Sequence, residues 1–96
     1  MAINKARKII VWHKNSFGNK VFDVFVHKSL YRKYRKYKDY LYDVGCSVAE
    51  FVLKINPDLR LLGSEDFEHI PEINAGIRAL VEELRREGFE EVEFPG

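Results

Sequence analysis

The sequence predicts an α/β fold, a two-layer sandwich in which two helices cover one face of a mixed four-stranded sheet. Residues 8–14 and 20–27 are rich in β-branched and aromatic side chains and flank a short loop. Two amphipathic helical patterns follow, and each precedes a short segment typical of a strand. The resulting order is ββαβαβ, without a repeat or a linker. We expect one domain over residues 1–96, because this length is too short for two independent cores.

The first two strands are expected to pair as a β-hairpin. The five residues between them include Gly18, which can take a positive φ at little cost. Side chains alternate between the two faces of a strand. One face of the second strand should carry Phe22, Val24 and Val26, and the other Val21, Asp23 and Phe25.

The longest helical pattern covers residues 29–55, with Ser29 suited to the N-cap. Its apolar and aromatic positions are spaced alternately by four and three, at Leu30, Tyr34, Tyr37, Leu41, Val44, Val48, Phe51 and Ile55. A continuous helix would be roughly 40 Å long, whereas a chain of this size has a diameter of about 34 Å. We therefore expect a long helix that breaks or kinks at Gly45, or an intact helix whose protruding end packs against a second copy.

The remaining elements follow from local signals. Asn56-Pro57 should end the long helix, and residues 58–63 should form a short strand. Residues 64–69 are expected to be an acidic loop or a single helical turn. Pro71 suits the first turn of the second helix and Gly88 its C-terminal cap. The buried stripe of that helix should contain Ile73, Ile77, Leu80, Val81 and Leu84. Residues 89–94 should form the last strand, with Val92 and Phe94 facing inward.

The formal net charge of +1 hides two opposed halves. Residues 1–48 carry eleven Lys or Arg against three Asp, a charge of +8. Residues 49–96 carry five Lys or Arg against twelve acidic residues, a charge of −7. Such asymmetry indicates a nucleic-acid or acidic partner, or self-association of unlike surfaces.

Most of the positive charge lies in residues 28–38, which hold six basic and three aromatic residues. Cations beside aromatic rings can neutralise phosphates while the rings stack on bases. On an α-helix, Tyr31, Arg35, Lys38 and Tyr42 would form one stripe. The candidate nucleic-acid-binding residues are Lys28, Tyr31, Arg32, Lys33, Arg35, Lys36, Lys38 and Tyr42. The alternatives are a solvated face whose tyrosines cover the edge of the core, and a basic face for a protein partner.

A second candidate site is acidic. Asp66, Glu68, His69 and Glu72 could hold a divalent metal and support a small metal-dependent hydrolase. Pro71 interrupts this segment, however, and no recognised metal spacing is present. Acidic residues before a helix are also favoured by its dipole alone. The structural interpretation is therefore preferred.

The sulfur and imidazole groups do not form a recognisable site. Cys46 is expected to be a small buried residue of the long helix, and a single cysteine excludes an intramolecular disulfide. His13 and His27 end the two hairpin strands, and the hypothesis for them is that they neighbour each other as a cross-strand surface pair.

Several function classes lack their sequence signals. There is no Gly-rich phosphate loop, no HExxH and no Gly-x-Ser-x-Gly elbow, so neither a cofactor nor a reaction is predicted. No membrane span or secretory signal is expected, which favours the cytoplasm. The absence of Gln and Thr beside 32% charged residues fits a thermophilic source.

The sequence therefore predicts a small non-enzymatic binding protein, which uses a basic, tyrosine-rich helix to contact nucleic acid or another anionic partner. The first alternative is a homodimeric interaction or regulatory module, because an overlong helix or an open sheet edge needs a partner. The second alternative is the metal-dependent hydrolase.

Overall fold

A computed structural model describes residues 2–42, 47–67 and 75–94. It contains four strands, β1 (Lys8–Lys14), β2 (Lys20–His27), β3 (Leu59–Asp66) and β4 (Glu90–Glu93). They form one sheet in the order β3-β2-β1-β4. The hairpin strands β1 and β2 are antiparallel, β3 is antiparallel to β2, and β4 is parallel to β1. The predicted mixed four-stranded sheet is thus confirmed, as is the sequence order of its strands.

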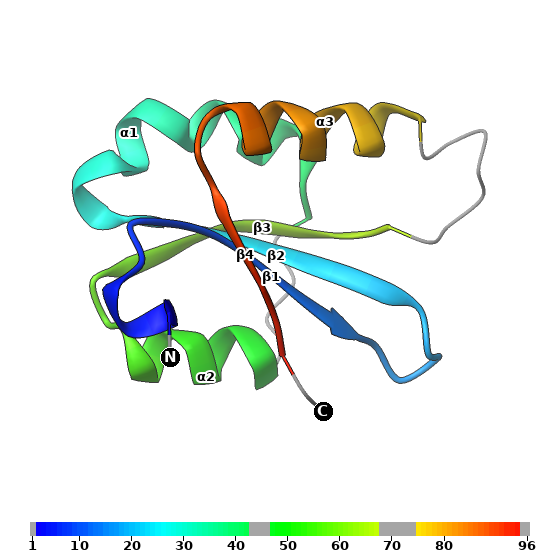
Figure 1. The fold of residues 1–96 in the computed structure, drawn as a ribbon, viewed down its shortest axis with the longest axis horizontal. Coiled ribbons are helices and arrows are strands. Elements are labelled where there is room, and N and C mark those ends of the chain that lie inside the picture. The colour runs from blue at the N-terminus through cyan, green and yellow to red at the C-terminus, as the bar shows by residue number, and fades with distance from the viewer. Residues whose placement is uncertain (1, 43–46, 68–74, 95–96) are drawn as a thin grey trace.

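Helices cover both faces of this sheet (Figure 1). One face carries α1 (Tyr31–Tyr34) and α3 (Ala75–Arg86), which agrees with the expected two helices on one face. The other face carries α2 (Ser47–Ile55), with the short 3-10 helix η1 (Ala2–Lys5) beside the same face. Two further 3-10 segments, η2 (Lys28–Leu30) and η3 (Arg35–Tyr40), flank α1. The additional layer formed by α2 is the main departure from the predicted sandwich.

The alternation of the hairpin divides the core into two clusters, as predicted. Toward α1 and α3, the sheet presents Ile10, Trp12, Phe22, Val24 and Val26, which pack with Tyr34, Tyr37, Leu80, Val81 and Leu84. Toward α2, it presents Ile9, Val11 and Phe25, which pack with Ile3, Ala49 and Val52. The radius of gyration of 12.4 Å is the value expected for one domain of this length.

The helix expected over residues 29–55 is divided into separate helices. Leu41 is extended, with φ −129° and ψ 153°. Tyr42 then forms an antiparallel bridge with Ser64, in which each backbone N–H donates to the other's carbonyl, at 2.9 and 2.7 Å. The chain thus leaves the helix before Gly45, which lies outside the described residues. The physical reason is that the apolar residues of its two halves belong to cores on opposite faces of the sheet.

The elements after α2 largely match their predictions. The helix ends at Ile55, before Asn56-Pro57. Strand β3 continues to Asp66, so residues 64–66 belong to the sheet and not to the expected loop. Gly88 caps α3 at φ 87°, with the Phe89 N–H donating to the Leu84 carbonyl at 3.1 Å. Pro71 lies outside the described residues. Among the described residues, no helix is long and apolar enough to span a membrane.

Candidate nucleic-acid interface

The basic segment is anchored to the core by two tyrosines. Tyr34 and Tyr37 are each only 3% exposed, and their rings stack with centroids 6.3 Å apart and an interplanar angle of 18°. Tyr34 also meets the edge of Phe89 at 5.4 Å. Because these rings are buried under α1 and η3, the opposite side of the segment must face solvent.

Four cations occupy that outer side, and we call them the cationic face: Arg32, Lys33, Arg35 and Lys36. All four side chains are exposed. Across the described ranges, no acidic side chain forms an ion pair with any of them. The cationic face therefore retains its charge toward solvent, and an anion could approach it without displacing an internal carboxylate.

The lysines of this region lie against the tyrosines. Lys33 Nζ is 5.3 Å from the centroid of the Tyr34 ring, and Lys36 Nζ is 5.3 Å from that of Tyr37. Such cation–π contacts are worth about 0.5–1 kcal/mol at exposed sites, and they restrict where the lysine stems can lie. Since the two rings are fixed in the core, they hold two ammonium groups of the cationic face in place.

The other predicted contact residues are placed differently. Lys28 forms an exposed ion pair with Asp58 at 3.3 Å. Tyr31 and Lys38 are half-buried, and Lys38 Nζ lies 5.5 Å from the Tyr31 ring centroid. Tyr42 lies beyond the end of η3. The expected stripe of Tyr31, Arg35, Lys38 and Tyr42 therefore does not form, because α-helical geometry ends at Tyr34 and 3-10 turns follow.

Two exposed tyrosines follow the cationic face along the chain. Tyr40 is the last residue of η3 and Tyr42 follows two positions later, and each is 66% exposed. Between them, Leu41 packs against the core. Tyr40 was missed by sequence reasoning. The available signal was an aromatic residue that lies off the apolar face of the helical pattern.

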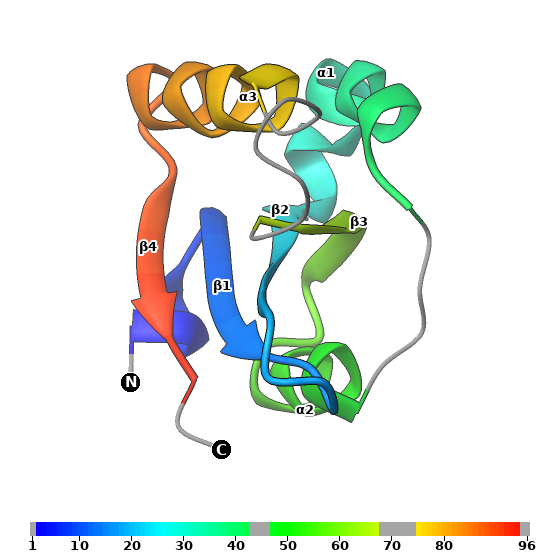
Figure 2. The same cartoon turned by 90° about the vertical axis from the view of Figure 1, so that its right-hand side faces the viewer.

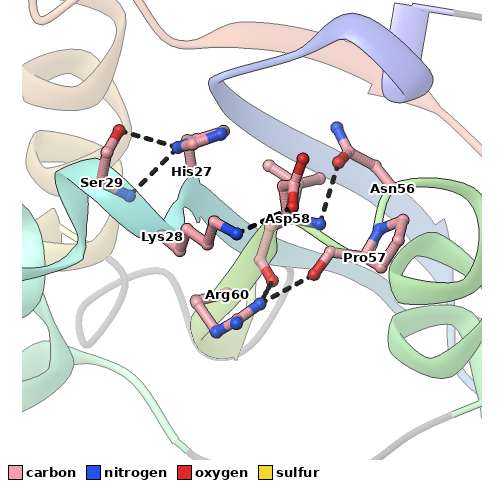
Figure 3. A network of polar contacts seen from close by, with 8 residues as sticks. His27, Lys28, Ser29, Asn56, Pro57, Asp58 and Arg60 are labelled. Carbon is pink, nitrogen blue, oxygen red and sulfur yellow. Dashed lines mark hydrogen bonds and ion pairs between the residues drawn. The ribbon is translucent and has the colours of Figure 1, made fainter.

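A polar network fixes the start of the basic segment (Figure 3). His27 Nδ1 accepts a hydrogen bond from the Ser29 backbone N–H at 3.0 Å, and it lies 2.7 Å from Ser29 Oγ. Across the network, the Asp58 carboxylate that pairs with Lys28 belongs to the turn after α2, where Asn56 Oδ1 accepts from the Asp58 N–H at 3.2 Å. These contacts tie the entry of the segment to the α2–β3 turn.

The two hairpin histidines are not neighbours, so that prediction is wrong. The antiparallel register places His13 opposite Val21, near the hairpin turn, whereas His27 lies at the far end of β2. His13 Nε2 instead contacts Asp23 Oδ2 at 2.9 Å. Each histidine is thus occupied by a different structural contact.

The acidic candidate site receives little support from the described residues. Asp66 ends β3 and accepts a hydrogen bond from Asn19 Nδ2 at 3.3 Å. Glu68, His69 and Glu72 lie outside the described residues, as does Cys46. Within residues 2–42, 47–67 and 75–94, no three His, Cys, Asp or Glu side chains are grouped to hold a metal.

The acidic side of the molecule begins next to the basic segment. Helices α1 and α3 lie side by side in one layer (Figure 2). Burial raises the pKa of Tyr37, and the negative charges of Glu83 on α3 and of Glu87 directly after α3 raise it further. Farther along α3, Arg85 binds Glu82 and Glu91. The acidic residues near α3 therefore lie beside the basic segment, while no carboxylate of the described residues forms an ion pair with the cationic face.

Comparisons with protein-family models, with curated proteins and with solved structures returned no match to this chain. Its function must therefore be inferred from its own geometry and charge.

Proposed function

We propose that this chain is a small non-enzymatic binding protein whose cationic face contacts nucleic acid or another polyanion. The observation that supports the proposal is the cationic face itself: four exposed cations that form no ion pair with a carboxylate of the described residues, on a segment anchored by buried tyrosines. Phosphates would replace the counterions that these cations hold in water, and the release of those counterions drives association.

Two lysines of the cationic face are restricted before any ligand binds, and this favours binding. Lys33 and Lys36 rest against rings that are fixed in the core. A side chain that is already restricted loses less conformational entropy when a ligand immobilises it. We therefore expect the cationic face to bind more tightly than four lysines scattered over a flexible loop.

The test compares two double variants that remove equal charge. Arg35→Gln/Lys36→Gln neutralises half of the cationic face. Lys14→Gln/Lys54→Gln removes two exposed lysines from β1 and α2. Fluorescence anisotropy with labelled oligonucleotides and with inorganic polyphosphate should show weakened binding for the first variant and near-normal binding for the second. Equal losses would indicate dependence on net charge alone and would contradict the proposal.

A homodimer is the second candidate, and it is favoured because acidic residues near α3 lie beside the basic segment on one side of the molecule. Residues 75–94, which include α3 and β4, carry six glutamates against three arginines, and α3 lies in the same layer as the basic segment (Figure 2). The glutamates of residues 82–93 in one copy could therefore cover the cationic face of another. Analytical ultracentrifugation at low and high salt tests this: a salt-sensitive dimer would support it, and a monomer at both salt concentrations would exclude it.

A further inference from the structure

We infer that the polyanion is a single-stranded nucleic acid whose bases stack on Tyr40 and Tyr42. This inference rests on the proposed function, because it requires that phosphates bind the adjoining cationic face. It adds the class of ligand: a chain that offers unpaired bases as well as negative charge.

The backbone holds both rings outward. Leu41 is extended and packs into the core, so its two neighbours project away from the core. Tyr42 is fixed to the edge strand by two backbone hydrogen bonds with Ser64. Each of the two tyrosines is thus 66% exposed on a segment whose backbone is held by the edge strand.

The faces of the Tyr40 and Tyr42 rings are available for stacking. Tyr31, Tyr34 and Tyr37 each have a lysine ammonium over the ring. Within the described ranges, by contrast, neither Tyr40 nor Tyr42 contacts another aromatic ring or a cation. A phenol that is ordered, exposed and unstacked offers a π-face to a base of any sequence.

The position of the rings fits an extended strand. Two residues of extended chain span about 6.6 Å, so the rings can each take one base of a strand whose bases are splayed apart. Tyr40 lies four residues after Lys36, so the strand's backbone could continue directly onto the cationic face. A duplex keeps its base faces inside the stack, where these rings could not reach them. Single strands should therefore be preferred.

The experiment measures the affinity of the full chain for a single-stranded oligonucleotide, a duplex and inorganic polyphosphate. Tyr40→Leu and Tyr42→Leu keep an apolar side chain but remove the ring. Each should weaken single-strand binding by about 5- to 150-fold, the range typical of one lost base stack. Polyphosphate affinity should stay unchanged. Phe17→Leu is the matched control, since this residue is 87% exposed and belongs to the hairpin loop, which lies away from α1 (Figure 1).

The possible failures are distinguishable. Single-strand affinity that survives in both tyrosine variants would overturn the inference, as would a duplex that binds as tightly as the single strand. If Arg35→Gln/Lys36→Gln still weakened polyphosphate binding in that case, the proposed function would stand without base stacking. If neither polyphosphate nor any oligonucleotide bound at low salt, the proposed function itself would fail. Trp12 fluorescence confirms that each variant is folded.

Discussion

Leu41 lies directly against Gly63, at the point where the basic segment reaches the sheet. A Cβ atom added at Gly63 would be only 2.5 Å from Leu41 Cβ and 3.0 Å from the Tyr42 carbonyl oxygen. Gly63 also has a φ of +155°, a backbone conformation that residues other than glycine rarely adopt. The glycine on β3 thus allows the close approach that fixes Tyr40 and Tyr42 at the surface.

Gly63→Ala should therefore destabilise the protein. The added methyl group must push the residue 41–42 segment away, and overpacking of this kind costs about 1–3 kcal/mol. Urea unfolding followed by Trp12 fluorescence measures the free energy of unfolding. Gly76→Ala is the control, because Gly76 lies in α3 with open space around its Cα. Alanine should stabilise that helix by up to about 1 kcal/mol. Similar effects at both positions would contradict the close contact.

Local patterns predict the hairpin but not the break of the long helix. The alternation in β2 assigns each side chain to one face, so local sequence is sufficient there. At Leu41, the helical periodicity continues without interruption in the sequence. The helix ends because Tyr42 pairs with Ser64, which is 22 residues away and whose position the local sequence does not indicate. Tertiary hydrogen bonds outweigh helix propensity at this point.

The buried Asp23 carboxylate should be important for stability. It is 0% exposed, Ser64 Oγ donates to its Oδ1 at 2.5 Å, and His13 Nε2 lies 2.9 Å from its Oδ2. Asp23→Ala leaves both partners without this acceptor, and each buried donor left unsatisfied costs about 1–3 kcal/mol, so we expect this variant to lose more stability than Ser64→Ala. Ser64→Ala should cost about 1.5–3 kcal/mol, as expected for a hydrogen bond to a charged group.

A double-mutant cycle tests whether these two residues act together. Asp23→Ala/Ser64→Ala should be little less stable than Asp23→Ala alone, because the hydroxyl has already lost its acceptor. The free energies of unfolding come from urea titrations of all four proteins. Strictly additive losses would show that the Ser64 hydroxyl stabilises the fold by another route.

The free energy of unfolding should decrease in acid, because the Glu91 carboxylate becomes protonated. A hydrogen bond from Arg85 lowers the pKa of this carboxyl, and one from Trp12 Nε1 at 3.0 Å lowers it further. Between the lowered folded pKa and about pH 4.3, the unfolded chain binds more protons than the folded one. The stabilisation is therefore present above this window and is lost as the pH falls through the folded pKa.

Glu91→Gln isolates this contribution. The variant should be less stable than the wild type near neutral pH, and the difference between them should shrink as the pH falls below about 4.3. Urea midpoints measured from pH 3 to 7 provide the comparison. Parallel curves for the two proteins would show that Glu91 does not couple folding to protons in this range.

The candidate site was predictable in part. The basic composition of residues 28–38 points to Arg32, Lys33, Arg35 and Lys36, and all four are exposed. The roles of Lys28 and Lys38 were not predictable, because their partners, Asp58 and the ring of Tyr31, depend on a turn after α2 and on 3-10 geometry. Tyr40 becomes prominent only because the helix ends directly after it.

The salt dependence of single-strand binding tests the central claim most directly. Four phosphate contacts on the cationic face predict that log K falls against log salt with a slope of roughly −2.8, and Arg35→Gln/Lys36→Gln should reduce its magnitude by about 1.4. Lys14→Gln/Lys54→Gln should leave the slope unchanged. Binding that does not depend on salt, or a slope that the first variant leaves as it was, would contradict the account.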